Sequence, residues 1–514
     1  MTSQHRKPPG PRVVIVGGGL AGLATAVALV GRGLRITLVE SRPRLGGRAS
    51  SFLDPATGEP VDNCQHVSLG CCTNLADFCR RVGTADLFLR GPEIVFLSPE
   101  GRVSRLRPGI LPAPFHLAGS FLRANYLSAS DKLRVAYGLA CLRSSRGDRP
   151  GEPFADWLLR HGQTVGTINR YWATVLVSAL NERLEQMDVG YARKVILDGF
   201  LRNREGCRME VPLVPLGELY GTRLETWLRE HEVAVLLMTG VRKVDVDAEE
   251  GLTGVTLRSG ETIDADFVVA AVPFDRVLGL FPGDLVGRIP DLTGLEALRA
   301  SPITGVHLWF DRPVCPFDHV VTVGRLIQWV FNHTAIQGRR APGQGGGQYL
   351  QLVISAAYDL LALDKTAIRN AVLAELSEIW PEASGARLLR WWVVTEHGAT
   401  FAVRPGVEAL RPRQRTPVEG LFLAGDWTAT GWPATMEGAV RGGYLAAEGI
   451  LEDLGRPIPL IQPELPPSLL ARWLLGPPDA GTAARFRQAI PPGGPGAHGG
   501  RAGRGRSWAR WTGR

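Results

Sequence analysis

The stretch VVIVGGGLAGLATAVALVGRGLRITLVE, residues 13–40, decides the fold of this chain. Its apolar run at 13–16 predicts a buried strand, the glycines after it predict a turn leading into a helix, and residues 35–39 predict a second strand. Gly17, Gly19 and Gly22 have the G-x-G-x-x-G spacing. The first glycine permits a tight turn, the second lets the backbone approach a diphosphate, and the third lets helix and strand pack closely. The stretch therefore predicts a dinucleotide-binding βαβ unit.

An acid and a second glycine turn extend this unit. Glu40 ends the second strand, where a carboxylate accepts hydrogen bonds from ribose hydroxyls and repels a 2′-phosphate. Leu20 and Ala21 begin the helix, whose free N–H groups and positive dipole end suit the diphosphate. The segment SRPRLGGR, residues 41–48, follows directly and predicts a second anion-binding turn, with Ser41, Gly46, Gly47 and Arg48 as candidate cofactor contacts.

A second cofactor signature lies nearly 400 residues later, at GLFLAGDWTATGWPATMEGAVRGGYLAAE, residues 420–448. Residues 421–424 predict a strand, Gly425 and Asp426 a sharp turn, and residues 436–448 a helix whose N-terminus faces the turn. The acid can accept hydrogen bonds from ribityl hydroxyls, and the helix start offers N–H groups to the N1–C2 edge of a flavin ring. Two such units in one chain predict FAD as the cofactor.

Composition bounds the remaining possibilities. The 514 residues are 45% hydrophobic and 21% charged, which is an ordinary globular balance for two or three domains. Much of the net charge of +8 comes from arginines near the two ends, and we infer no nucleic-acid partner. The seven cysteines form no C-x-x-C, so we expect reduced thiols and no metal site. Only residues 13–30 are long and uncharged, and the nucleotide fold explains them, so we expect a cytoplasmic protein, in solution or peripheral at the inner face of the plasma membrane.

A polar cluster lies between two apolar segments just after the first unit. It contains Asp62 and His66, and buried polar groups there need partners such as a flavin or a substrate. His66 is the only group of the cluster that titrates near neutral pH, so it could relay a proton, although a lone histidine is more often structural. Asp62 is a second candidate acid, although such a carboxylate is more often a cap or turn residue. Both are our candidate catalytic residues.

These motifs carry a family resemblance. Residues 41–48 resemble the extended motif of FAD-dependent amine oxidases and carotenoid-type desaturases. The block from Gly47 to Cys71 resembles the hydroxysqualene dehydroxylases, also called squalene-associated FAD-dependent desaturases, with Cys64 where that family usually has glycine. The resemblance places the backbone of Val241 against the adenine, Asp426 at the ribityl-diphosphate end, and Met436, Glu437 and Gly438 at the ring.

The resemblance also implies an activity. Reduced FAD, supplied by an external electron donor, would give a hydride to hydroxysqualene, water would leave, and squalene would form on the route to hopanoids or other triterpenes. Loss of an allylic hydroxyl needs an acid near the oxygen within a dry, apolar tunnel. Three alternatives stay open: a carotenoid-type polyene desaturase, a polyene isomerase that uses reduced FAD without net redox change, and a flavin-binding protein without turnover.

The fold class that follows is α/β, with a Rossmann-like FAD-binding domain of the GR2 type, an inserted α+β substrate domain and a disordered C-terminal tail. We expect residues 12–90, 230–290 and 405–455 in the FAD-binding domain, 91–229 and 291–404 in the substrate domain with its helical cap, and 470–514 in the tail. Residues 111–122 form an apolar, proline-punctuated stretch that is either a membrane-contacting flap for a hydrocarbon substrate or a plain domain cover.

Overall fold

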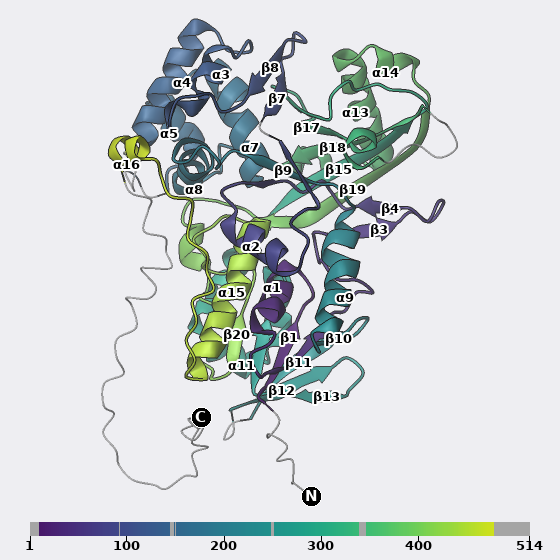
Figure 1. The fold of residues 1–514 in the computed structure, drawn as a ribbon, viewed down its shortest axis with the longest axis vertical. Coiled ribbons are helices and arrows are strands. Elements are labelled where there is room, and N and C mark those ends of the chain that lie inside the picture. Colours follow the sequence, from purple (N-terminus) through teal and green to yellow (C-terminus); the bar gives the residue numbers. More distant parts are fainter. Residues whose placement is uncertain are drawn as a thin grey trace, which may run out of the picture.

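The computed structural model describes residues 10–91, 93–143, 149, 151–247, 251–338 and 346–476. Figure 1 shows two lobes: the lower one holds a parallel sheet between helices, and the upper one holds a larger mixed sheet beside a group of helices. The predicted α/β fold with an inserted substrate region is confirmed. Part of the predicted tail, residues 477–514, lies outside the described residues.

The lower lobe is organised on a five-stranded sheet in which every neighbouring pair is parallel. Its strands, in spatial order, are β10 (Ala234–Leu236), β2 (Arg35–Val39), β1 (Arg12–Val16), β14 (Phe267–Ala270) and β20 (Leu421–Leu423). The central strand β1 is buried on both faces, which explains its unbroken apolar run. Val13 and Ile15 join the core under the helices, while Val14 and Val16 join the core on the opposite face.

Two helices from opposite ends of the chain lie side by side on this sheet: α1 (Leu20–Leu29) and α15 (Met436–Asp453). A Cβ atom at Gly443 would lie 2.3 Å from the carbonyl oxygen of Ala21, so only glycine allows this approach. The Thr25 hydroxyl donates a hydrogen bond to the Gly443 carbonyl at 3.1 Å across the same contact. The two predicted cofactor units therefore meet in space.

Smaller elements complete the lower lobe and join it to the upper one. Residues 216–228, which the sequence pattern assigned to the substrate domain, pack with α1 and α15 in one core. The turn residues at 54–58 predict a hairpin, and the structure confirms it as β3 paired with β4. The smaller strands of the lower lobe are the hairpin of β3 (Ser51–Leu53) and β4 (Pro60–Asp62), the sheet of β11 (Val241–Asp247), β12 (Gly251–Leu257) and β13 (Thr262–Asp264), and the sheet of β5 (Ser68–Leu69), β9 (Met209–Pro212) and β6 (Phe88–Gly91). Its smaller helices are α2 (Thr73–Arg81), α9 (Arg223–Glu230), α10 (Phe274–Val277), η5 (Leu278–Leu280), α11 (Gly283–Gly287), η6 (Pro290–Ala297) and η8 (Val407–Leu410).

The upper lobe contains a seven-stranded sheet that is antiparallel except for the parallel pair β16 and β7. Its order is β19 (Leu388–Phe401), β15 (Ala300–Phe310), β18 (Gln348–Ser355), β17 (Trp329–Asn332), β16 (His319–Thr322), β7 (Ile94–Leu97) and β8 (Val103–Leu106). The sequence pattern at 365–380 predicts a covering helix, and α13 (Lys365–Ile379) confirms it by covering one face through Ile368, Val372 and Leu376. Short helices α12 (His333–Gln337), η7 (Tyr358–Leu360) and α14 (Glu382–Gly385) flank it.

Helices make up the rest of the upper lobe. They are η1 (Phe115–Leu117), α3 (Ala118–Leu122), α4 (Ala129–Leu142), α5 (Phe154–Arg160), α6 (Val165–Thr167), η2 (Ile168–Ala173), α7 (Thr174–Leu180), α8 (Val189–Lys194) and η3 (Val195–Leu201). The next helix in the chain, η4 (Gly217–Thr222), belongs to the core of the lower lobe. The sequence predicts a helix over 129–142 that is capped at Ser130 and Asp131, and α4 has these bounds. Its N-cap, however, is Ser128, with Asp131 completing a capping box. Among the helices of the described part of the chain, none is long and apolar enough to cross a bilayer.

The C-terminal segment corrects one prediction. Residues 470–475, which the composition placed in a disordered tail, belong to helix α16 (Leu469–Leu475). Its N-cap Ser468 accepts a hydrogen bond from the Ala471 N–H at 3.0 Å and donates one to the Ala113 carbonyl at 2.5 Å. Ala471 is fully buried. The segment is ordered because it packs on the upper lobe, which a count of prolines and glycines does not reveal.

Candidate active site

One cavity of about 2020 Å³ runs between the two lobes. Drug-sized ligands occupy pockets of roughly 300–1,000 Å³, so this cavity has room for a dinucleotide together with a long second ligand. Most of the predicted cofactor residues line it: Gly17, Gly19, Leu20, Ala21, Glu40, Ser41, Gly46, Gly47, Arg48, Val241, Gly425, Asp426, Met436 and Glu437. We call the part of the cavity formed by these residues the dinucleotide end.

At the dinucleotide end, the start of α1 meets the second glycine turn. Gly19 is the N-cap of α1 and supplies no side-chain cap, while Gly19, Leu20 and Ala21 line the cavity. Gly19 and Gly46 form a parallel β-bridge, and the Gly46 N–H donates to the Gly18 carbonyl at 2.8 Å. The first N–H groups of the helix therefore face the cavity beside a bare backbone surface, as a diphosphate requires. Gly22 lies behind this wall, where its role is helix packing.

Glu40 is held by main-chain donors at the end of β2. One carboxylate oxygen accepts the Gly18 N–H at 2.7 Å and the other accepts the Arg42 N–H at 2.8 Å. The side chain is 8% exposed and lines the cavity. Since each carboxylate oxygen can accept more than one hydrogen bond, this fixed acid can still receive ribose hydroxyls.

An ion pair joins the N-terminal loop to the C-terminal turn. An Arg48 guanidinium nitrogen lies 2.6 Å from Asp426 Oδ1, and a second nitrogen donates to the Ala399 carbonyl of β19 at 2.8 Å. Burial acts to lower the pKa of Arg48, but the Asp426 carboxylate outweighs it, so the pKa is raised and the cation is firmly held. Three distant segments are fixed around one charge pair at the edge of the cavity.

The start of α15 is used in a different way from the prediction. Thr435 caps the helix by accepting the Gly438 N–H at 3.0 Å, and Gly438 lies outside the cavity wall. Glu437 lines the cavity, but its carboxylate accepts the Leu75 N–H at 2.8 Å, the side-chain amide of Asn74 at 2.8 Å and the guanidinium of Arg441 at 2.9 Å. The acid therefore ties α15 to the start of α2.

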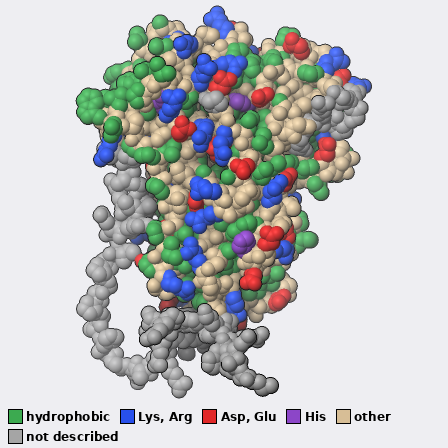
Figure 2. All heavy atoms as spheres, viewed as in Figure 1, with side chains coloured by type: hydrophobic (Ala, Val, Ile, Leu, Met, Phe, Trp, Pro, Cys, Tyr) green, Lys and Arg blue, Asp and Glu red, His purple; other side chains and the backbone are tan. Residues whose placement is uncertain are grey.

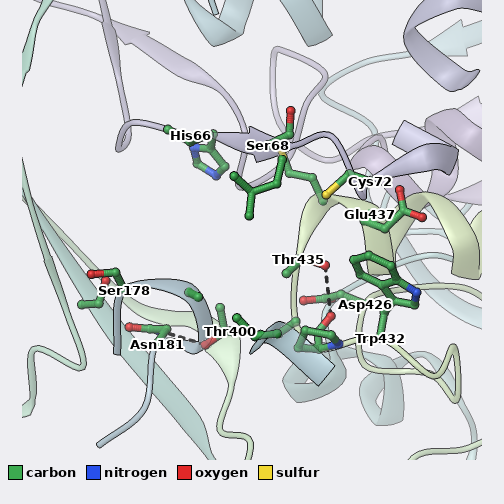
Figure 3. A pocket seen from close by; sticks show the side chains of 18 of the residues that line it. His66, Ser68, Cys72, Ser178, Asn181, Thr400, Asp426, Trp432, Thr435 and Glu437 are labelled. Carbon is green, nitrogen blue, oxygen red and sulfur yellow. Dashed lines mark hydrogen bonds between the residues drawn. The ribbon is translucent and has the colours of Figure 1, made fainter. Parts of the chain in front are cut away.

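The two candidate catalytic residues have different surroundings. Asp62 is 1% exposed and lies outside the cavity wall, where it accepts the Ser51 hydroxyl at 2.5 Å and the Leu216 N–H at 2.9 Å. It holds β4 against the segment before η4, so we withdraw it as a proton donor. His66 lines the cavity and points into it (Figure 3).

His66 is a neutral group in this site. Its Nδ1 lies 2.9 Å from the Cys64 carbonyl oxygen, so Nδ1 carries the proton and Nε2 is left as an acceptor. Burial lowers the pKa of His66, and the Arg48 cation adds to this effect against the pull of the Cys64 carbonyl. Burial also raises the pKa of the neighbouring Cys64 thiol to about 12. The Cys64 thiol is thus protonated and not a nucleophile.

The remainder of the cavity is lined mostly by apolar side chains, with a few charged ones such as Lys194 and Asp198, and we call it the apolar end. Its walls come from α3, α4, α7, η3, α16 and one face of the seven-stranded sheet. The apolar pattern of 152–220 predicts helices that form either a pocket wall or plain core packing, and the pattern of 290–400 predicts a sheet with Trp329 available to line the pocket. Trp329 does line the cavity, whereas the contribution of α16 was not predicted. The lining side chains include Phe121, Leu133, Ala136, Leu139, Val175, Phe200, Leu201, Ile303, Val321, Trp329, Phe331, Val353, Leu474 and Leu475.

A few polar side chains lie opposite His66 in Figure 3, and the sequence reasoning missed them. Asn181 donates to the Thr400 hydroxyl at 2.9 Å and to the Ser301 carbonyl at 3.1 Å, so it mainly joins α7 to the sheet. Ser178 donates to the Thr174 carbonyl at 3.2 Å. Thr400 lies at the end of β19, after a Glu-His-Gly sequence that interrupts the alternation of the strand, and that interruption was the available signal.

The dinucleotide end fits FAD. It offers an uncapped helix start and a glycine turn for the diphosphate, a fixed acid for the ribose, and the start of α15 beside Asp426 for the ribityl chain and ring. The family model for flavin-containing amine oxidoreductases matches residues 20–451, which includes Gly22 and Glu40 of the first unit and all of the second unit.

Curated relatives cover most of the chain. It is 29% identical over 460 residues to the 15-cis-phytoene desaturase of an Oncidium hybrid cultivar, covering 86% of this chain and 78% of the relative. It is 27% identical over 485 residues to the zeta-carotene desaturase of Synechocystis sp., covering 87% of this chain and 98% of the relative.

Solved structures share the fold. An oxidoreductase from Methanosarcina mazei superposes with a TM-score of 0.65 at 18% identity, covering 86% of this chain and all of the other. A putrescine oxidase variant superposes with a TM-score of 0.63 at 19% identity, covering 86% of this chain and 99% of the other. With the geometry of the dinucleotide end, these findings place the chain in the flavin-containing amine oxidoreductase family, with FAD as its cofactor.

Proposed function

We propose that the protein dehydrogenates an acyclic isoprenoid chain, introducing a double bond as the carotenoid-type desaturases do. The observation that carries the proposal is the single cavity in which the dinucleotide end continues into the apolar end without a partition. A long hydrocarbon in the apolar end would meet the flavin site beside His66. The phytoene and zeta-carotene desaturases among its relatives support the same class of substrate.

The state of His66 favours the oxidising direction. Desaturation removes a hydride from one carbon and a proton from its neighbour, and the electrons of the second C–H bond become the double bond. FAD supplies the hydride acceptor and is reoxidised by an external electron acceptor. His66, neutral with Nε2 facing the cavity, can accept the proton. The apolar walls exclude the water that would otherwise add to a cationic intermediate.

Hydroxysqualene reduction is the second candidate, and a specific observation favours it. Asn63, Gln65 and His66 from the block that resembles the hydroxysqualene dehydroxylases all line the cavity on its flavin side. A hydrocarbon has no use for such polar groups, whereas an alcohol could hydrogen-bond to them. This direction needs an external electron donor and a proton donor for the departing hydroxyl, and a histidine held neutral is poorly suited to that role.

One assay separates the candidates. The purified protein with FAD is incubated with phytoene and a quinone acceptor, and in a separate reaction with hydroxysqualene and a chemical reductant. The products of both reactions are identified by mass spectrometry. Loss of two hydrogens from phytoene supports desaturation. If hydroxysqualene is converted to squalene while phytoene is unchanged, desaturation is refuted and hydroxysqualene reduction is supported. A polyene that changes geometry at constant mass would show the isomerase alternative instead.

A further inference from the structure

The apolar end of the cavity reaches the protein surface between α3, α4 and α16. Phe115, Leu122 and Leu133 line the cavity, yet their side chains are 47%, 67% and 74% exposed. Leu474 and Leu475 of α16 line the same part of the wall. A wall residue can be this exposed only where the wall is at the surface, so this is a mouth of the cavity.

More apolar side chains surround this mouth without lining it. Ile110 is 98% exposed, Leu469 87%, Trp473 80% and Tyr137 59%. The Ser468 hydroxyl bonds to the Ala113 carbonyl, so α16 and the loop before η1 are fixed next to each other. Figure 2 shows hydrophobic side chains gathered on the upper left of the molecule, over the helices of the upper lobe. Exposed apolar groups in such numbers mark an interaction surface.

The charge of the same segments indicates the chemistry of the partner. Residues 103–143 and 466–476 contain seven basic residues and one acidic residue, Asp131. That acid is already used in the capping box of α4. Arg123, Lys132 and Arg134 donate to main-chain carbonyls, which leaves their charges uncompensated by these bonds. Apolar side chains beside a basic rim complement the acyl chains and anionic headgroups of a lipid bilayer.

We propose that α16, the segment 110–122 and the exposed face of α4 form a docking surface for an anionic lipid bilayer, with Leu469 and Trp473 inserted at the level of the headgroups. The mouth of the cavity then opens into the bilayer, and an acyclic isoprenoid enters the apolar end without crossing water. The substrate part of this inference rests on the proposed function, whereas the docking itself does not. Aromatic side chains such as Trp473 favour this interfacial depth.

Vesicle flotation of the full-length protein with FAD tests the docking without any turnover. Vesicles of phosphatidylcholine mixed with phosphatidylglycerol should retain at least about tenfold more protein than vesicles of phosphatidylcholine alone, and added salt should reduce the difference. The double variant Leu469→Ser with Trp473→Ser should lower retention by about tenfold, since each side chain loses its burial in lipid. Leu53→Ser, at a leucine of β3 that is also largely exposed (67%) but lies outside this surface, is the control and should bind normally.

Two further variants separate the parts of the surface. Arg123→Gln with Arg134→Gln should reduce the preference for anionic vesicles while leaving weak binding to neutral ones. Trp473→Phe should keep vesicle binding but lose part of the quenching of tryptophan fluorescence by brominated lipids. Because this variant still folds and binds, the lost quenching would place Trp473 in the bilayer.

Equal retention by both kinds of vesicle, or equal loss in the Leu53→Ser control, would overturn the proposal. So would a stable dimer by light scattering that the Leu469→Ser and Trp473→Ser variant dissociates, because a second copy would then cover the surface. A protein that docks on vesicles but fails to convert any isoprenoid would refute the proposed function alone.

Discussion

The dinucleotide end and the apolar end belong to one cavity, but they are built from different parts of the chain. Main-chain groups of glycine-rich turns and helix starts form most of the first, for example at Gly19, Gly46 and Gly425. Side chains from many elements form the second. Backbone geometry demands particular residues at fixed spacing, whereas an apolar wall accepts any side chain of suitable size. The cofactor site is therefore encoded by short local sequence motifs, whereas substrate selectivity depends on the tertiary structure.

The charged groups differ between the ends in the same way. Arg48 and Asp426 form a buried pair at the dinucleotide end, and Glu40 is fixed by two N–H groups. His66 lies where the two ends meet, and its surroundings keep it neutral. Substitution of a residue at this junction should lower turnover without lowering FAD affinity. This expectation provides the first test of the difference between the two ends of the cavity.

His66→Gln should have the largest effect. If Nε2 accepts the proton of the substrate, turnover falls by about 100-fold or more, which is the usual contribution of a general base. FAD affinity, measured by flavin fluorescence titration, should stay within about twofold, because His66 does not belong to the diphosphate or ribityl contacts. Equal losses of turnover and FAD affinity would mean that the residue is part of the dinucleotide end.

The pH profile gives the direction of the proton transfer. The pKa of His66 lies below its ordinary value of 6.5, so the neutral form is present above that lowered pKa and lost below it. A base must be neutral, and kcat/KM for desaturation should therefore fall as the pH drops through this range, with no such fall in the Gln variant. A rate that rises toward acidic pH would instead indicate a proton donor and favour hydroxysqualene reduction.

Asp426→Ala compared with Asp62→Ala tests the assignment of the two acids. Loss of Asp426 leaves Arg48 without its partner at the cavity wall, and FAD affinity should fall by about 10- to 100-fold, since hydrogen bonds to charged groups contribute about 1.5–3 kcal/mol. Asp62→Ala removes buried bonds to Ser51 and Leu216, so it should lower the melting temperature while folded protein retains FAD. Equal FAD loss in both variants would show that Asp62 also belongs to the site.

Much of the dinucleotide end was predictable from the sequence. The spacing of Gly17, Gly19 and Gly22, the acid at Glu40 and the turn at Gly425 each impose a local backbone form, and the structure assembles them as expected. The roles of side chains were less predictable. Asp62 and Glu437 are carboxylates in the expected places, but each is consumed by N–H groups of segments distant in sequence.

For the apolar end of the cavity, the sequence predicted only that apolar residues would be present, not which of them would line the wall. Aromatic and aliphatic residues in 152–220 indicated helices, but their pattern fits core packing equally well. The strands of the seven-stranded sheet and helix α16 contribute wall residues that no local signal distinguishes from core. Ser468 followed by an apolar run is an ordinary helix-start signal, but the prediction of a disordered tail rested on the neighbouring prolines and glycines and overlooked it.

Gly443→Ala tests whether the closeness of α1 and α15 builds the dinucleotide end. The new Cβ would lie 2.3 Å from the Ala21 carbonyl, so the helices must separate, at a cost of about 1–3 kcal/mol. Both thermal stability and FAD affinity should decrease together. Gly385→Ala in α14, where a Cβ meets nothing within 4 Å, is the matched control and should leave both unchanged. A Gly443→Ala protein with normal FAD affinity would separate helix packing from cofactor binding.

Ala136→Trp should have the smallest effect, and it isolates the apolar end. Ala136 is an exposed residue of α4 that lines the cavity near its mouth, so a large side chain narrows the passage without disturbing the core. The KM for a long isoprenoid should rise about tenfold, which is the loss of one good apolar contact, while FAD affinity and melting temperature stay constant. Tyr137→Trp, on the same helix but outside the cavity wall, should leave the KM unchanged. An unchanged KM in Ala136→Trp would mean that substrate enters elsewhere. Because the two substitutions place the same side chain on neighbouring positions, a KM increase in both would mean that the effect does not depend on the cavity wall, and the division of the cavity into two independently tunable ends would fail.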